Sequence, residues 1–154
     1  MKSLVPWLAA IGLACSSVAA HAVQSKLRQP STLSADALWE KVGDFCGISK
    51  WHPAVEKCEL SKDGKTRTLS LKGGGTIVEH LVKWDDRHHS YTYRIVKSPL
   101  PVSNYLSTIK VVKDKDGSAF EWSGRYRAKG ASDAESKKTI DGIYQAGASN
   151  ITKD

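Results

Sequence analysis

Thiol, imidazole and indole groups gather in one short stretch, DFCGISKWHPAVEKCEL, which covers residues 44–60. Cys46 and Cys58 bracket Trp51 and His52. An even number of cysteines favours a disulfide in an oxidising compartment, and such a bond would stabilise the fold by about 2–3 kcal/mol. The alternative is two buried thiols that lie too far apart to bond. Structural zinc needs four ligands at tight spacing. Cys46, His52 and Cys58 supply three at irregular spacing, so no metal site is predicted.

Glu79 is the acidic side chain best placed for chemistry in a pocket, because it lies in the middle of a predicted strand, Ile77-Val78-Glu79-His80-Leu81-Val82. Apolar residues occupy both parities of this strand, so the alternation does not decide which set faces inward. An inward Glu79 would be a desolvated carboxylate with a raised pKa, or it would pair with Arg94. Both orientations remain open.

Aromatic side chains recur along the second half of the chain, at Tyr91, Tyr93, Tyr105, Phe120, Trp122, Tyr126 and Tyr144. In the predicted strand at 118–127, Phe120, Trp122 and Tyr126 share one parity and are expected to face the interior. Such residues can form a plain core. They can also line a pocket in which hydroxyl groups and an indole N–H orient a mostly apolar ligand.

Other residues that could suggest catalysis or binding are excluded by their context. Gly73–Gly75 lacks the Lys-Ser/Thr pair and the helix that follow a phosphate-binding loop. His88 and His89 lie beside Asp85 and Asp86, but adjacent residues in a hairpin turn point apart. No nucleophile, base and acid can be assembled into one set. We therefore predict no catalytic residue, no cofactor and no metal ion.

Two helices must frame the strands that carry these residues. Ser34 is the predicted N-cap of a helix over 35–45, and residues 48–55 form a short helix or a bend between Gly47 and Pro53. Near the C-terminus, Ser132-Asp133-Ala134-Glu135 is a capping box that begins a long helix. Its apolar stripe consists of Ile140, Ile143, Tyr144, Gly147 and Ile151.

The region between these helices is predicted to form strands. A further strand, at the edge of the sheet, is predicted at 23–31, before the first helix. The predicted strands are 58–61, 67–72, 76–84, 90–97, 105–113 and 119–128. Short turns rich in Gly and Asp separate them, which favours antiparallel neighbours. A sheet with one apolar face and a helix with one apolar stripe can bury these surfaces by packing against each other. We therefore predict an α+β fold in a single domain over 23–154, with a curved antiparallel sheet wrapped around the C-terminal helix and a cavity between them.

The N-terminus has the pattern of an export signal. Lys2 precedes an apolar run, and Ala20-His21-Ala22 fits a cleavage site of small residues. We predict a signal peptide over 1–22, cleavage after Ala22 and a periplasmic mature protein without a stable membrane anchor, in which Cys46 and Cys58 are the remaining cysteines. Lipidation of Cys15 is the alternative, but the residues before Cys15 make a poor lipobox.

The chain carries a net charge of +7. Its basic residues, Arg67 among them, are scattered rather than clustered, whereas nucleic-acid binding requires a concentrated basic surface. We predict no nucleic-acid partner. The scattered charge would serve either as a solubilising surface or to steer docking to an acidic partner.

Several motifs resemble those of one protein family: WHPAV at 51–55, GGTIVE at 74–79, WDD at 84–86, YRIV at 93–96, SPLPVSNY at 98–105 and EWSG at 121–124. Together they resemble the polyketide cyclase/dehydrase and lipid-transport group of the SRPBCC superfamily, which includes START domains and the birch-pollen allergen family. Within it the chain is similar to exported methanol-oxidation accessory proteins of the MxaD type. The resemblance covers residues 33–151 and implies a helix-grip fold.

In that fold, Trp51 and His52 would lie at the mouth of the cavity, although a core Trp51 and a loop-bonding His52 are the alternative. The predicted pocket residues are Trp51, His52, Glu79, Tyr93, Tyr105, Trp122 and Tyr144. We expect a non-enzymatic protein that binds a small apolar molecule. The MxaD resemblance implies an accessory role beside an acidic dehydrogenase or cytochrome c. A cyclase- or dehydratase-like enzyme, with Glu79, His52 and a tyrosine as acid and base groups, is the further alternative.

Overall fold

The computed structural model describes residues 22–151. Residues 1–21 of the predicted signal peptide, Cys15 among them, lie outside this range. The elements follow in the order β1 (Val23–Ser31), α1 (Ala35–Val42), α2 (Ile48–Trp51), β2 (Val55–Leu60), β3 (Thr66–Leu71), β4 (Thr76–Asp85), β5 (Ser90–Lys97), β6 (Val102–Asp114), β7 (Gly117–Ala128) and α3 (Asp133–Ile151). The edge-strand prediction for 23–31 is confirmed.

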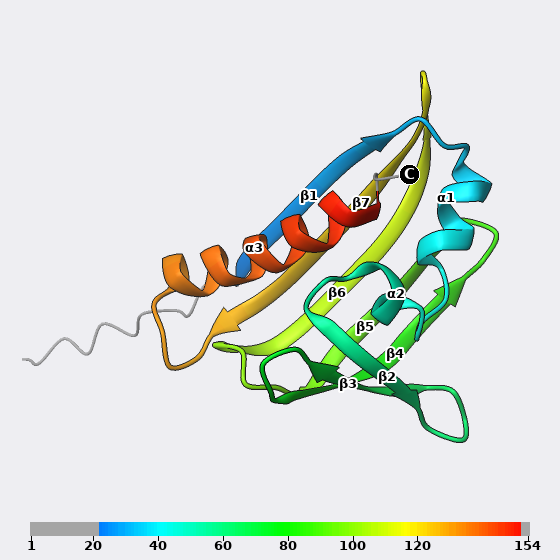
Figure 1. The fold of residues 1–154 in the computed structure, drawn as a ribbon. Helices are drawn as coiled ribbons and strands as arrows, with labels where there is room; N and C mark the ends of the chain where they lie inside the picture. Colours follow the sequence, from blue (N-terminus) through cyan, green and yellow to red (C-terminus); the bar gives the residue numbers. More distant parts are fainter. Residues whose placement is uncertain (1–21, 152–154) are drawn as a thin grey trace, which may run out of the picture.

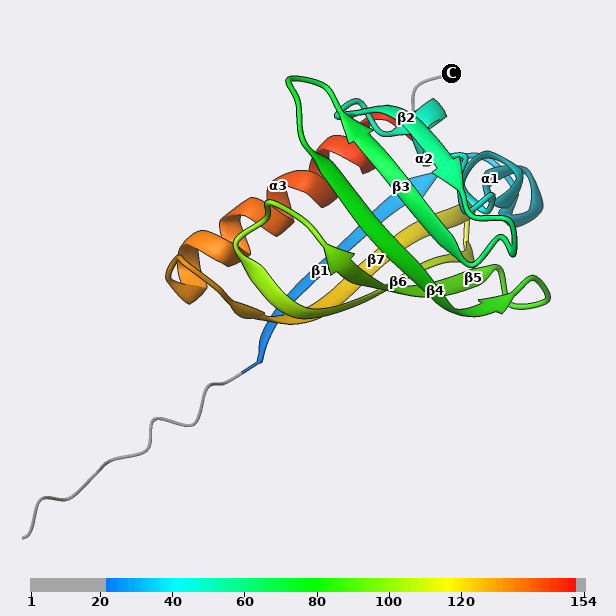
Figure 2. The same ribbon diagram turned by 90° about the horizontal axis from the view of Figure 1, so that it is seen from below.

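The strands form one seven-stranded sheet in the order β1-β7-β6-β5-β4-β3-β2. All paired neighbours are antiparallel. Bulges interrupt the pairing of β2 with β3, β4 with β5 and β6 with β7, and bulges bend and twist the strands that carry them. Figures 1 and 2 show the resulting curved sheet with α3 lying along one of its faces. The predicted helix-grip α+β fold is confirmed.

The first helix begins as predicted and ends earlier. Ser34 Oγ accepts a hydrogen bond from the Ala37 amide at 3.2 Å, as expected of an N-cap. The helix ends at Val42 instead of the predicted Phe45. Two contacts draw the chain out of the helix: Asp44 Oδ1 accepts from the Cys46 amide at 3.0 Å, and the Phe45 carbonyl accepts from the Arg67 guanidinium.

The C-terminal helix starts at the predicted capping box. The Glu135 carboxylate accepts from the Ser132 amide at 2.9 Å, and Ser132 Oγ accepts from the Glu135 amide at 3.2 Å. The buried face of α3 includes Ile140, Tyr144, Gly147, Ala148 and Ile151. This face packs against β1 and β7. Among residues 22–151, no helix combines the length and apolar character needed to cross a bilayer.

Alternate residues along the strands are buried and form the core. In β7, Phe120, Trp122 and Tyr126 are buried, while Ser123, Arg125 and Arg127 are exposed, as predicted. In β6, Tyr105, Ser107, Ile109 and Val111 share the inward parity. Two of these buried residues, Tyr105 and Trp122, also line the site described next.

Candidate ligand-binding site

A cavity of about 290 Å³ lies between the inner face of the sheet and α3. This is close to the lower end of the range of about 300–1,000 Å³ that is typical of ligand pockets. Its walls are mostly apolar and come from α2, from strands β2 to β7 and from α3, with Ile48, Val55, Leu69, Ile77, Ile95 and Ile140 among them. The segment at 98–101 connects β5 to β6, and its Leu100 also lines the cavity.

Five of the predicted pocket residues line this cavity: His52, Glu79, Tyr93, Tyr105 and Trp122. The other two, Trp51 and Tyr144, are buried behind its wall. Both pack on Trp122: Trp51 meets it edge to face at 5.7 Å between ring centroids, and Tyr144 stacks on it at 4.4 Å. A ligand-binding role for any of these residues stays a prediction.

His52 is held as a neutral imidazole. Its Nε2 donates to the Ile143 carbonyl of α3 at 3.0 Å, and its Nδ1 accepts from the Ala54 amide at 3.2 Å. Burial is the main cause that lowers the pKa of His52 below its ordinary value. The close approach of the ring to α3 depends on Gly147, because a Cβ there would lie 2.8 Å from His52 Cδ2. His52 therefore joins α3 to the segment after α2.

Glu79 faces inward, and its partner is Arg67 rather than Arg94. Only 7% of the Glu79 side chain is exposed, and its Oε2 accepts from Arg67 Nε at 2.6 Å. The pair is formed across neighbouring strands, since Arg67 of β3 lies opposite Glu79 of β4. Arg94 is exposed on the outer face. The pairing with Arg94, one of the two alternatives for an inward Glu79, is wrong because inward Glu79 and outward Arg94 lie on opposite faces of the sheet.

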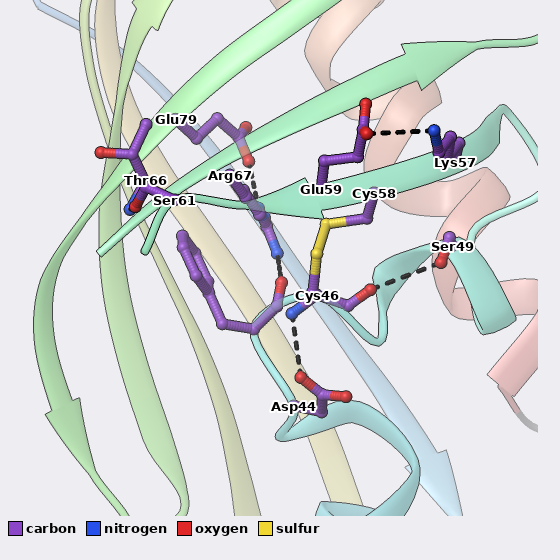
Figure 3. The surroundings of a disulfide bond; sticks show 11 residues. Asp44, Cys46, Ser49, Lys57, Cys58, Glu59, Ser61, Thr66, Arg67 and Glu79 are labelled. Atoms are coloured by element: carbon purple, nitrogen blue, oxygen red, sulfur yellow. Dashed lines mark hydrogen bonds and ion pairs between the residues drawn. A yellow bond between two sulfur atoms is a disulfide. The ribbon is translucent and has the colours of Figure 1, made fainter. Parts of the chain in front are cut away.

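Arg67 is completely buried and is surrounded by groups that favour its charge. Figure 3 shows it between the Glu79 carboxylate and the turn that carries Asp44 and Cys46, where its Nη1 donates to the Phe45 carbonyl. Its guanidinium carbon also lies 4.2 Å from the centroid of the Phe45 ring and 4.9 Å from that of Tyr93. Burial alone would lower the pKa of Arg67, but the Glu79 carboxylate and nearby tyrosines raise it above its ordinary value.

A chain of hydroxyl groups runs from Tyr105, on the cavity wall, to Tyr144 and Ser107 behind it. Ser107 Oγ donates to the Ser123 carbonyl at 2.8 Å, so Tyr144 must donate to Ser107 across 3.0 Å. Tyr105 must then donate to Tyr144 across 2.7 Å. Trp122 Nε1 donates to both Tyr93 and Ser107 at 3.0 Å. Burial raises the pKa of Tyr93, Tyr105 and Tyr144, so these phenols stay protonated.

The predicted disulfide is present. Cys46 and Cys58 are bonded, with their Cα atoms 5.6 Å apart. The bond ties the turn before α2 to β2, directly beside the carbonyl that binds Arg67 (Figure 3). Among residues 22–151, no three His, Cys, Asp or Glu side chains are grouped so that they could hold a metal ion.

Sequence reasoning missed Arg67 and Ser107. It grouped Arg67 with the scattered surface charges and passed over Ser107. The signal that would have found them is parity: Arg67 shares its parity with Leu69 and Leu71 in β3, and Ser107 shares its own with Tyr105 and Ile109 in β6. A polar residue that alternates in phase with apolar ones faces the interior.

A second, more polar hollow lies on the outer face of the sheet. Its larger part, about 500 Å³, is lined by Arg94 and Lys97 of β5 and by Lys129, which directly follows β7. A smaller part of about 220 Å³ shares Leu106 with it and adds Lys26 and Arg125. In the described part of the chain, none of these five cations forms an ion pair.

Solved structures with the same architecture include proteins from three bacteria. The protein XoxI from Bacillus cereus is 32% identical, with a TM-score of 0.82, and the match covers 84% of this chain and 93% of that one. An uncharacterized protein from Bacillus thuringiensis is 31% identical over 86% of this chain and 96% of that one, with a TM-score of 0.79. A protein from Thermobifida fusca shares the fold at 22% identity and a TM-score of 0.72, over 85% of this chain and 90% of that one.

No curated protein matches the sequence. A family model does: the one described as "Polyketide cyclase / dehydrase and lipid transport" matches residues 22–154. The match spans the whole sheet, α3 and every residue that lines the cavity. This chain therefore belongs to the polyketide cyclase/dehydrase and lipid transport family.

Proposed function

We propose that this protein is an exported carrier that binds a small, mostly apolar molecule in the cavity beneath α3. The observation that supports this proposal best is the cavity itself, whose walls are largely aliphatic and aromatic and whose few polar groups are held by hydrogen bonds. Apolar walls with a few fixed polar groups are typical of ligand sites. The family also supports the proposal, since its description includes lipid transport.

Binding fits the electrostatics of this site better than acid–base catalysis does. A general base should have a pKa near the working pH and a free lone pair that faces the substrate. His52 uses both ring nitrogens for backbone contacts, and burial holds the tyrosine hydroxyls in their protonated form. The Glu79 carboxylate is already paired with Arg67. Of these groups, Glu79 and the tyrosines can orient a ligand without exchanging protons with it.

Export to the periplasm is part of the proposal. The disulfide supports it, because such bonds persist in oxidising compartments. The position of β1 supports it as well, since this strand begins at Val23, directly after the predicted cleavage site at Ala22. Cleavage there would leave every strand of the sheet intact.

The test is to purify the protein from the periplasm and measure its mass under native and denaturing conditions. We expect an additional small-molecule mass that is lost on denaturation, and an N-terminus at Val23. Ile140→Phe, which would fill part of the cavity, should lose the additional mass, whereas Val96→Phe on the outer face should retain it. A native mass equal to that of the bare chain, unchanged after incubation with apolar ligands, would contradict the carrier function.

The outer hollow supports a second candidate function, docking to an acidic periplasmic protein. Arg125 of β7 and Arg94 of β5 both lie opposite Leu106 of β6, so two cations flank one aliphatic side chain. No Asp or Glu lines either part of the hollow. Such a surface complements a partner that presents carboxylates around an apolar contact. With the MxaD resemblance, it makes an acidic dehydrogenase or cytochrome c the proposed partner.

Binding of an acidic c-type cytochrome at low and high salt tests this second function. Docking through exposed charges should weaken as salt screens them. Arg94→Glu and Arg125→Glu should each weaken binding at low salt, while Lys62→Glu, in the turn between β2 and β3, should change it little. Affinity that depends on neither salt nor these arginines would count against docking at the outer hollow.

A further inference from the structure

Several polar groups on the cavity wall already use their protons for hydrogen bonds within the protein. His52 Nε2 donates to the Ile143 carbonyl, and its Nδ1 accepts from the Ala54 amide. The Tyr105 hydroxyl donates its proton to Tyr144. Neither His52 nor Tyr105 can therefore donate a proton to a ligand, and two other side chains on the wall supply a charged acceptor and a free donor.

Glu79 offers a free acceptor. Its Oε2 receives the Arg67 Nε–H at 2.6 Å, and this is the hydrogen bond that the carboxylate forms within residues 22–151. Glu79 lines the cavity, so its second oxygen can accept a hydrogen bond from a ligand. Because Arg67 already balances the charge of the carboxylate, the ligand need not bring a positive charge.

Tyr93 offers a free donor. Its oxygen accepts from Trp122 Nε1 at 3.0 Å, but within residues 22–151 its own proton has no acceptor. The raised pKa of Tyr93, caused mainly by burial, keeps that proton in place. Tyr93 lines the cavity as Glu79 does.

The free acceptor and the free donor are neighbours on the inner face of the sheet. Tyr93 of β5 lies opposite Leu81 of β4, two residues from Glu79. Such diagonal neighbours are about 7–8 Å apart at their backbones, which is within reach of long side chains. Arg67 links them further, because its guanidinium binds Glu79 and lies 4.9 Å from the centroid of the Tyr93 ring.

We propose that the cavity selects an apolar molecule that carries one hydroxyl group, which donates its proton to Glu79 and accepts the proton of Tyr93. This inference rests on the proposed carrier function. The volume of about 290 Å³ suits roughly ten non-hydrogen atoms, at about 30 Å³ for each water-sized group. The ligand class is thus a medium-chain or small cyclic alcohol, or a phenol.

The other simple head groups fit less well, each for a physical reason. An ether or an alkane leaves the Glu79 oxygen without a donor, and a carboxylate would be repelled by Glu79. An ammonium group would add a second cation beside Arg67, and the single carboxylate cannot neutralise both in a site removed from water. A hydroxyl group matches one acceptor and one donor without net charge.

The first test uses the unaltered protein and four ligands of equal size: 1-octanol, its isomer heptyl methyl ether, nonane and octylamine. Binding is followed by tryptophan fluorescence, since Trp122 lines the cavity. Octanol should bind about tenfold more tightly than each of the others, because hydrogen bonds to charged groups are among the stronger ones. Equal affinities for octanol, ether and nonane would overturn the inference and leave the carrier function standing. No binding by any of the four would overturn both.

The second test assigns the preference to the two residues. Tyr93→Phe should weaken octanol and ether binding several-fold and leave nonane unchanged, because both oxygen-containing ligands accept from Tyr93. Glu79→Gln should weaken binding of octanol and of octylamine, whose ammonium group loses the carboxylate, and leave the ether and nonane unchanged. Glu59→Gln, which removes an exposed carboxylate on β2, should change none of these affinities.

Glu79→Gln also removes the partner of a buried cation, so folding of each variant must be checked by circular dichroism. Tyr93→Phe avoids this difficulty, because Trp122 Nε1 keeps its bond to Ser107. An octanol-to-nonane affinity ratio that stays the same in folded Tyr93→Phe would contradict the proposed role of the hydroxyl group.

Discussion

At the scale of single residues, Arg67 and Glu79 carry opposite charges in a place with almost no water. Arg67 is entirely buried and Glu79 nearly so. Removing one partner from a buried pair leaves the other charge uncompensated, whereas replacing both with apolar groups of similar size is much less harmful. The pair is thus more costly to break than to replace.

The first prediction follows from this asymmetry. Glu79→Leu should lower the free energy of unfolding by about 3–5 kcal/mol, measured by urea denaturation at neutral pH. The double substitution Arg67→Met with Glu79→Leu should recover most of that loss. A double variant as unstable as Glu79→Leu would show that packing around the site, rather than the unpaired charge of Arg67, dominates.

His52 gives a prediction on pH. An unfolded histidine titrates near pH 6.5, and burial is the main cause that lowers the pKa of folded His52 below that value. As the pH falls below about 6.5, the unfolded chain binds a proton that the folded chain does not, so the free energy of unfolding decreases. His52→Gln should reduce this decrease between about pH 7 and pH 5. His88→Gln, at an exposed turn, should retain it.

At the scale of elements, two glycines of α3 have opposite surroundings. A Cβ at Gly147 would lie 2.8 Å from His52 and 3.0 Å from both Trp51 and Trp122, whereas a Cβ at Gly142 would meet nothing within 4 Å. The close contacts at Gly147 explain why a poor helix former is found there.

Alanine at each of these glycines therefore gives a matched pair of variants. Gly142→Ala should raise the free energy of unfolding by about 1 kcal/mol, the difference in helix propensity. Gly147→Ala gains the same propensity but overpacks the contact with His52, which typically costs about 1–3 kcal/mol, so we expect net destabilisation. Equal effects of the two variants in thermal or urea unfolding would contradict the close packing at Gly147.

The elements could be predicted well from the sequence because they depend on local patterns. The capping box at Ser132 and the alternation of Phe120 and Trp122 are properties of short segments, and both predictions are confirmed. The end of α1 could not be predicted, because the Phe45 carbonyl leaves the helix to bind Arg67, which is distant in the sequence.

The candidate site could be predicted only in part for the same reason. The orientation of Glu79 depends on which strand pairs with β4, and the strand itself is apolar on both parities. Trp51 and Trp122 are both buried aromatic residues, but only Trp122 lines the cavity. Which of two packed rings reaches the cavity depends on the three-dimensional arrangement of α2, α3 and the sheet.

At the scale of the whole molecule, the disulfide joins the helical segment at 35–51 to β2, which forms one edge of the sheet. Cys46 and Cys58 are 12 residues apart. A crosslink that closes a loop of this size stabilises the folded state by up to about 3 kcal/mol, largely by constraining the unfolded chain.

The double substitution Cys46→Ser with Cys58→Ser should therefore lower the free energy of unfolding by roughly this amount. A reducing agent should destabilise the native protein but leave the double variant unchanged. A reductant effect on the double variant would contradict this explanation.

The strand order leaves β1 and β2 at the two edges of the sheet. An open edge with unpaired backbone groups can recruit a second copy and begin aggregation. Pro30 cannot donate a backbone hydrogen bond, and Lys26 and Arg28 add charge along β1. The other edge, β2, has only six residues, carries Glu56, Lys57 and Glu59, and contains a bulge. Both edges thus carry features that oppose edge-to-edge pairing with a second copy.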